Sequence, residues 1–224
     1  SSITSTDAVL TVTPIQTLLI DFGHGTLTTS MGASPNDPAN NWNNVTQTVG
    51  TSTSGVLSNL VTSGGATTAI NLQMVSRFNS SSPASYLGTD TSVVFPANAT
   101  GDFLYGNTGL FNGLSNITPV FKLTGLDPAR SYDFTFYASR IGETSNLEAS
   151  YTVSGATTSS TALNPVDNID GTATVYGIFP TAGGEITISL APTANNNSAK
   201  QFTLLSAIRI DAAAPDEPVV FLQE

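Results

Sequence analysis

The residues from Val120 to Val153 constrain the fold of this chain more than any other segment. Within Ser131–Ala138, whose sequence is SYDFTFYA, the aromatic residues Tyr132, Phe134 and Phe136 occupy every second position. A side-chain period of two is typical of a strand with one buried face. Shorter runs of the same kind, Val120–Leu123 and Leu147–Val153, flank it. The segment therefore predicts three consecutive strands of an all-β fold.

Strand-like runs recur along the rest of the chain, separated by glycine, proline and asparagine, and no run is a convincing helix. A β-sandwich of about 100 residues holds about seven to nine strands, whereas this chain of 224 residues offers about eleven. We therefore expect a two-sheet jelly-roll β-sandwich. The further predicted strands include Leu18–Phe22, Val45–Val49, Ala69–Phe78, Ser159–Leu163, Ala173–Ile178, Glu185–Leu190 and Phe202–Ile210.

Turn-forming residues also suggest domain limits and exposed loops. We expect residues 1–13 to be the last strand of a preceding Ig-like domain or a linker, with a first strand of this domain as the alternative. Residues 14–211 would form the jelly-roll module, and residues 212–224 a linker or the start of the next module. Three polar or glycine-rich stretches are predicted surface loops, where recognition usually occurs. They are Thr28–Asn44, Asn79–Thr91 and Asp102–Leu114.

The composition excludes several classes of function. The formal net charge is −10, and the six basic residues are scattered along the chain. Such a chain has no cluster of basic residues that could bind along a phosphate backbone, so we exclude nucleic acid as a partner. The same charge argues against anionic membrane surfaces, and no apolar run reaches the ~18 residues of a membrane span. Without cysteine, the chain has no disulfide and no thiolate metal site.

Two known families share motifs with this chain. Leu123, Leu126, Pro128 and Tyr132 resemble the fibronectin type III turn that precedes a tyrosine corner. From Leu18 to Asp211, the chain more widely resembles the jelly-roll accessory modules of secreted bacterial multidomain proteins, which include galactose-binding-like and malectin-like domains. The resemblance implies a glycan-binding role without indicating the sugar. It is carried by LLIDFG, WNNVT, the run from Asn59 to Asn79, FTFYASR, SYTV, GEITI and FTLLSAIRI.

Trp42 is the strongest candidate for a ligand contact. It is the sole tryptophan, lies in a predicted polar loop, and is followed by Asn43 and Asn44. An aromatic plate matches the apolar face of a sugar ring, and neighbouring amides match its hydroxyls. The alternative is that Trp42 folds inward and plugs the end of the sandwich.

Other aromatic residues and one arginine are further candidates. Tyr86, Tyr105 and Phe111 lie in the other two predicted loops, where they either bind a ligand or cap the core. Tyr137 is predicted to point away from the core face, and Arg140 lies just beyond that strand. Together they offer a ring and a guanidinium fork to a sugar hydroxyl or carboxylate. A structural arginine that bonds loop carbonyls is the alternative.

Calcium is the one cofactor that the sequence suggests. Terminal strands of jelly rolls often pair, which would bring Asp21 near Asp211, and the resemblance implies a structural calcium near such ends. Asp167 and Asp170 offer further oxygen ligands in a turn, although the segment fails the EF-hand pattern. Plain Asx turns are the alternative there.

Catalytic chemistry has little support in the sequence. His24 is the only histidine, and the Gly-x-Ser-x-Gly elbow is absent. Three glutamates, Glu143, Glu148 and Glu185, leave a carboxylate-based glycosidase open. We therefore expect a non-catalytic carbohydrate-binding module, secreted or at the cell surface. Its partners would be a polysaccharide and neighbouring domains of the same parent chain. The alternatives are a structural spacer or adhesin-stalk domain and, second, a polysaccharide hydrolase or lyase.

Overall fold

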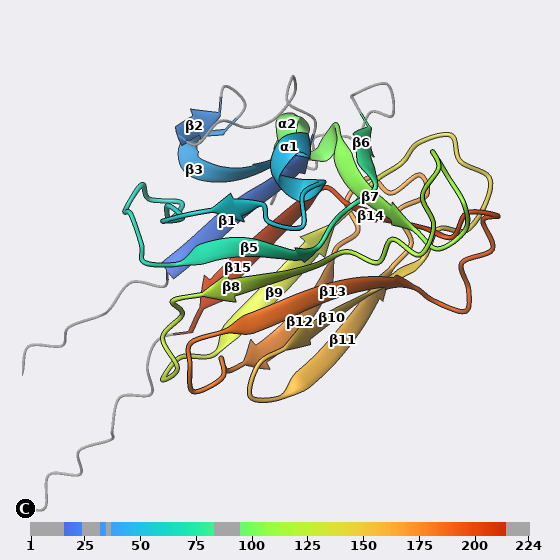
Figure 1. Cartoon of the computed structure of the whole chain (residues 1–224). Helices are drawn as coiled ribbons and strands as arrows, with labels where there is room; N and C mark the ends of the chain where they lie inside the picture. The colour runs from blue at the N-terminus through green and yellow to red at the C-terminus, as the bar shows by residue number, and fades with distance from the viewer. Residues whose placement is uncertain (1–15, 24–31, 35–36, 83–94, 214–224) are drawn as a thin grey trace, which may run out of the picture.

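The computed structural model describes residues 16–23, 32–34, 37–82 and 95–213, which form an all-β sandwich (Figure 1). Two six-stranded sheets make the layers, and a small third sheet lies at one end. Among the described residues, the helices are two single turns, α1 (Gln47–Gly50) and α2 (Ala97–Thr100). The all-β class predicted from the sequence is confirmed.

The first sheet joins the two ends of the described chain. Its β1 strand pairs with β15 in antiparallel fashion and with β3 in parallel fashion. The pairing of the first and last strands, expected from the sequence, is confirmed. In sheet order, the strands are β12 (Ala173–Ile178), β9 (Tyr132–Tyr137), β15 (Ala207–Ala212), β1 (Gln16–Gly23), β3 (Asp37–Thr46) and β2 (Gly32–Ser34).

The second sheet is antiparallel throughout, and the third sheet covers one end of the sandwich. The second sheet contains, in order, β11 (Thr158–Leu163), β10 (Ala149–Ser154), β13 (Ile186–Pro192), β8 (Val120–Thr124), β5 (Asn71–Ser76) and β4 (Val56–Leu57). The third sheet contains β14 (Phe202–Leu205), β7 (Phe103–Asn107) and β6 (Ser80–Ser82).

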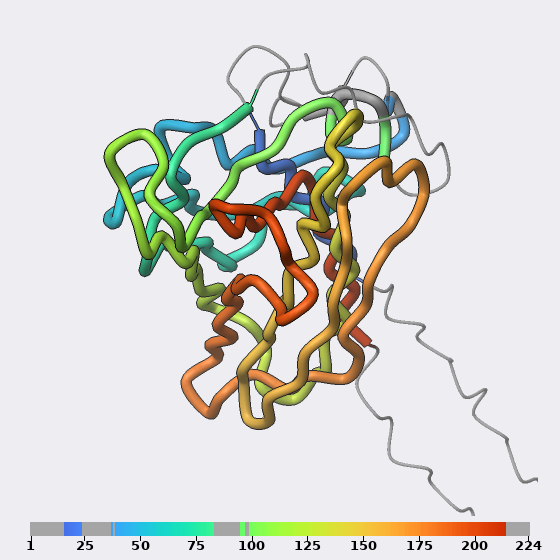
Figure 2. The backbone as a smooth tube through the Cα atoms, turned by 90° about the vertical axis from the view of Figure 1, so that its right-hand side faces the viewer, coloured from blue at the N-terminus to red at the C-terminus, as the bar shows by residue number. Residues whose placement is uncertain are grey.

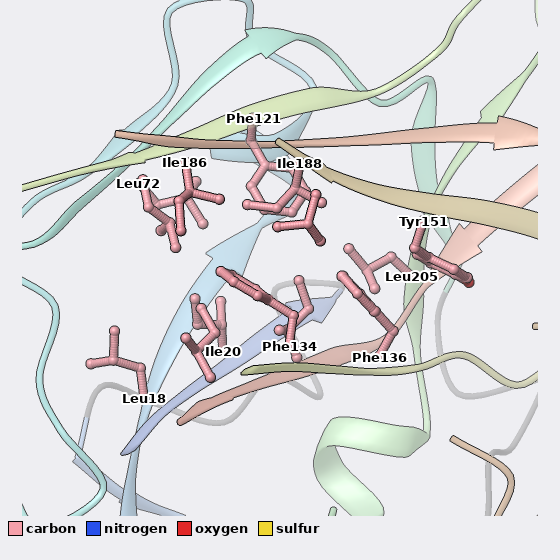
Figure 3. Close-up of a cluster of buried hydrophobic side chains, with 14 of the residues drawn as sticks. Leu18, Ile20, Leu72, Phe121, Phe134, Phe136, Tyr151, Ile186, Ile188 and Leu205 are labelled. Atoms are coloured by element: carbon pink, nitrogen blue, oxygen red, sulfur yellow. The ribbon is translucent and has the colours of Figure 1, made fainter. Parts of the chain in front are cut away.

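The main core lies between the two large sheets and follows from the period of two in the sequence. Buried and partly exposed residues alternate along β8 and β10, as predicted. Phe136 of β9 stacks on Tyr151 of β10 with ring centroids 4.8 Å apart, so these two strands tie the layers together. Figure 3 shows Leu18, Ile20, Phe134 and Phe136 of the first sheet pointing toward Leu72, Phe121, Ile186 and Ile188 of the second.

The tyrosine corner predicted before β9 is confirmed. The hydroxyl of Tyr132 accepts a hydrogen bond from the backbone N–H of Asp127 at 3.0 Å. The bond ties the turn after β8 to the first residue of β9, and it explains why a tyrosine opens a strand whose other inward residues are phenylalanines.

Several predicted loops are instead strands. Asp37–Asn44 belongs to β3, Phe103–Asn107 forms β7, and Ser80–Ser82 forms β6. The polar composition of β3 misled the prediction, because its asparagines bond backbone groups of neighbouring segments. The predicted strand Phe202–Ile210 is divided at Ser206 into β14 and β15, which belong to different sheets. The flanking segments 1–13 and 214–224 lie outside the described residues, so the domain limits stay predictions.

Tyr151 should give the fold a measurable alkaline transition. Its hydroxyl is buried and donates to the carbonyl of Leu204 at 2.6 Å, and burial raises the pKa of Tyr151 above its ordinary value. In the unfolded chain the phenol ionises near pH ~10, so its contribution to stability is complete below that pH and is lost as pH rises further. Above this pH, we expect ionisation of Tyr151 in the unfolded chain to lower the free energy of unfolding by up to ~1.4 kcal/mol per pH unit.

Urea unfolding between pH 8 and 11 measures this loss. Tyr151→Phe should flatten the alkaline slope while costing about 1 kcal/mol near neutral pH through the lost hydrogen bond. Equal alkaline slopes for the native chain and the variant would contradict the assignment.

Candidate functional site

An aromatic pocket lies at the end of the sandwich that carries the third sheet. Its volume is about 170 Å³. Residues 108–119, 138–148 and 193–201 connect strands at this end, which is at the right in Figure 1 and faces the viewer in Figure 2. These loops are bonded to one another, since the N–H of Gly109 donates to Lys200 and the N–H of Asn197 donates to Asn146. The described residues that line the pocket are Ser81, Ser82, Phe103, Tyr105, Phe111, Arg140, Phe202 and Leu204.

Three rings from different segments form an edge-to-face cluster in the pocket. Phe111 and Phe202 lie 4.9 Å apart at 87°, and Tyr105 and Phe202 lie 5.5 Å apart at 88°. Such pairs add about 0.5–1.5 kcal/mol each beyond the burial of their area. The rings of Phe111 and Phe202 remain partly exposed. The pocket therefore offers apolar surface that is held in place before any ligand arrives.

Two buried amides position the hairpin that carries Phe111. Asn79 donates to the side-chain oxygen of Asn107 at 2.5 Å and to the carbonyl of Phe111 at 3.2 Å. Asn107 in turn donates to the carbonyls of Gly109 and Leu114 at 2.6 and 3.0 Å. Because buried polar groups are costly unless bonded, this arrangement specifies one hairpin conformation.

Arg140 brings charge to the wall of the pocket. Its Nη2 lies 3.1 Å from Oε2 of Glu143, and its guanidinium carbon lies 5.8 Å from the ring centroid of Phe202. The second distance suits a cation–π contact. Of the residues predicted from the sequence, the structure brings Tyr105, Phe111 and Arg140 together here.

Trp42 does not lie at this pocket. Its side chain is 0% exposed, and its indole N–H donates to Oδ2 of Asp37 at 2.7 Å. Asn43 is also buried, and its side chain bonds Val61 and Leu19 through backbone groups. Trp42 is therefore buried, as the inward alternative expected, but it lies in a cluster on the outer side of the first sheet and not over the end of the sandwich. The expected surface plate with Asn43 is wrong. Asn44 is partly exposed, and its role stays a prediction.

Tyr137 is also a structural residue. It does point away from the main core, as predicted, but that side of the sheet is covered by a second cluster. Its hydroxyl donates to the carbonyls of Asn168 and Ile169 at 3.3 Å. The prediction that Tyr137 joins Arg140 at a ligand is therefore wrong, and Tyr86 lies outside the described residues. The second cluster consists of Leu19, Trp42, Phe95, Ala99, Tyr137 and Ala207.

Tryptophan fluorescence should report this burial directly, because Trp42 is the sole indole. We expect blue-shifted emission in the native chain and little quenching by iodide, since the ring has no exposed surface. Unfolding in urea should shift the emission to the red and open the indole to iodide. Red-shifted, readily quenched emission from the native chain would contradict the structure.

Asp21 and Asp211, the first pair of predicted metal ligands, lie apart in the structure. Asp21 is opposite Ala207 and Asp211 is opposite Thr17, so the two aspartates are four positions, or roughly 13 Å, apart along the paired strands. Asp211 accepts from Thr17 and pairs with Arg209.

The turn of Asp167 and Asp170 is closed by the side chain of Asn168, which bonds the N–H and the carbonyl of Gly171. This is the Asx turn considered as the alternative there. Among the described residues, no three His, Cys, Asp or Glu side chains gather as metal ligands do. A structural calcium stays a prediction.

The three candidate catalytic glutamates each bind a different partner. Glu143 pairs with Arg140 and Glu185 pairs with Lys122. Glu148 accepts from the side chains of Thr193 and Asn195 at 2.6 and 2.8 Å. His24 lies outside the described residues. None of the helices among the described residues is long and apolar enough to cross a membrane.

Comparison with known proteins identifies no family. No protein-family model matches the chain, and no curated protein matches it. Solved structures with partial similarity include the ANX2 ectodomain from Arabidopsis thaliana, with 17% identity over 64% of this chain and 51% of that one, and a TM-score of 0.35. The plant receptor-like kinase FER gives 15% identity over 64% and 50%, with a TM-score of 0.39. The chain spans about half the length of these proteins, and the scores are too low to establish a shared fold or function.

Proposed function

We propose that this chain is a non-catalytic carbohydrate-binding domain and that its site is the aromatic pocket. The observation that carries the proposal is the cluster of Tyr105, Phe111 and Phe202 beside Arg140 around one hollow. Partly exposed rings suit the C–H face of a sugar, while guanidinium N–H groups suit its hydroxyls. The pocket is smaller than the roughly 300–1,000 Å³ of sites for drug-sized ligands. It therefore takes one sugar unit of a longer polysaccharide.

The absence of paired acids at the pocket favours binding over catalysis. Glycoside hydrolysis needs two carboxyl groups about 5–9 Å apart around the scissile bond. Among the described residues that line the pocket there is no acidic side chain, and the neighbouring Glu143 is paired with Arg140. We further propose that the domain belongs to a larger secreted or cell-surface bacterial protein, with a polysaccharide and adjacent domains as its partners.

A structural spacer or adhesin-stalk domain is the second candidate. It is favoured by the burial of Trp42, since a spacer needs no exposed aromatic plate. The aromatic pocket favours the first candidate, because a spacer has no need of a hollow lined by partly exposed rings.

Calorimetric titration with a panel of neutral oligosaccharides and polysaccharides separates the two candidates. A binding domain should give dissociation constants between about 1 mM and 1 μM for at least one member. Binding should be weakened by about tenfold or more in Phe202→Ala and kept in Trp42→Phe, which retains a ring in the interior. If the folded native chain binds no member of the panel, the carbohydrate proposal fails and the spacer is favoured.

A further inference from the structure

The charge at the aromatic pocket is balanced by a glutamate that the sequence had suggested only as a catalytic acid. Arg140 is the one charged side chain among the described residues that line the pocket. Its partner Glu143 is only 3.1 Å away, and both side chains are 21% exposed. At that distance and partial burial, the carboxylate cancels most of the field that Arg140 would project into the pocket.

Glu143 is fixed where it neutralises Arg140. Its Oε1 accepts hydrogen bonds from the backbone N–H groups of Thr144 and Ser145 at 3.1 and 3.3 Å. Its Oε2 faces Arg140. The carboxylate thus bonds its own loop through one oxygen and the arginine through the other. A ligand cannot displace it from Arg140 without breaking contacts of the loop.

From this geometry, and resting on the proposed carbohydrate function, we propose that Glu143 determines specificity by making the pocket selective for uncharged sugar units over uronic acids. An uncharged sugar hydroxyl suits this pocket, since it can accept from Arg140 and brings no charge toward Glu143. A ligand carboxylate at Arg140 would instead lie against the carboxylate of Glu143. Like charges placed together at an interface are strongly unfavourable, and the formal net charge of −10 adds to the repulsion.

The test uses matched pairs of ligands. Hexose oligosaccharides of gluco, manno and galacto configuration are each compared with their C6-oxidised uronate. The proteins are the native chain, Glu143→Gln and Glu185→Gln. The last is a matched control, because Glu185 is also a glutamate in an ion pair, with Lys122 at 2.9 Å, and it precedes β13 at the end far from β14. Both variants remove one negative charge.

For the configuration that binds, the native chain should prefer the neutral sugar by about tenfold or more at low salt. In Glu143→Gln the affinity for the uronate should rise by about tenfold, while Glu185→Gln behaves as the native chain does. Equal native affinities for the two ligands would overturn the inference. So would an unchanged ratio in Glu143→Gln or an equal shift in Glu185→Gln. If no ligand of either kind binds any protein, the proposed function itself fails.

A second measurement needs no variant and keeps the inference testable if Glu143→Gln does not fold. Salt screens repulsion between partly exposed charges, and the Debye length falls from about 10 Å at 0.1 M to about 3 Å at 1 M. The preference of the native chain for the neutral sugar should therefore shrink as salt rises. A preference that does not change with salt would show that charge repulsion is not its cause.

Discussion

Replacing Trp42 with alanine is expected to lower the free energy of unfolding by about 3–5 kcal/mol. The indole is fully buried in the cluster on the outer side of the first sheet, where its ring lies 6.1 Å from that of Phe95. The substitution empties this volume and removes the hydrogen bond to Asp37. Urea denaturation followed by far-UV circular dichroism measures the change without needing the lost fluorophore.

The control for this prediction is Trp42→Phe, which keeps a ring but loses the N–H donor. Its cost should be smaller than that of Trp42→Ala, because most of the buried volume is kept. Neither substitution should change ligand affinity when the protein is folded, since Trp42 is not among the residues that line the pocket. A loss below about 1 kcal/mol in Trp42→Ala would contradict the interior position of the ring.

Replacing Phe202 with alanine is expected to weaken carbohydrate binding by about tenfold or more, or about 1.4 kcal/mol at least. Phe202 contacts both other rings of the cluster edge to face and lies under the guanidinium of Arg140. The substitution removes apolar surface and also the support that orients Phe111. Residues of this kind, aromatic and central to a pocket, usually dominate binding energies. Titration calorimetry against the best ligand of the panel measures the loss.

The matched control is Phe179→Ala. Phe179 is 44% exposed and follows β12 at the end of the sheet where Ile178 lies opposite Tyr132, far from the pocket. It should leave affinity unchanged. Thermal unfolding of both variants shows whether each remains folded at the temperature of titration. Folded Phe202→Ala that binds as tightly as Phe179→Ala would exclude the pocket as the site.

The sequence predicted the strands whose side chains alternate clearly between apolar and polar. The run from Val120 to Val153 and the tyrosine corner at Tyr132 could be found because burial of one face imposes a period of two. Strand β3 could not be predicted in this way, because its asparagine side chains form hydrogen bonds with backbone groups that come close only in the folded chain. Asn43, for example, reaches Val61 and Leu19. A polar sequence is thus compatible with an interior strand when neighbouring segments supply the hydrogen bonds.

The sequence also predicted only part of the candidate site. Tyr105 and Phe111 were candidates because they lie in a predicted loop, where recognition usually occurs, and Arg140 because it lies just beyond a strand. The structure brings all three to the pocket, although Tyr105 lies in strand β7 and not in a loop. Trp42 and Tyr137 were misplaced because the sequence does not indicate that the outer side of the first sheet is covered as well. Phe202 was predicted only as part of one continuous strand, Phe202–Ile210, since the break at Ser206 between β14 and β15 does not show in the apolar pattern.

Hydrogen exchange with and without a neutral oligosaccharide from the panel tests the central claim most directly. With the ligand near saturation, backbone amides in residues 103–111, 140–145 and 202–205 should exchange more slowly, because these segments form or support the aromatic pocket. Exchange around Trp42 in β3 should not change. Protection confined to β3 or to the outer face of the second sheet, or no protection at all, would contradict the account.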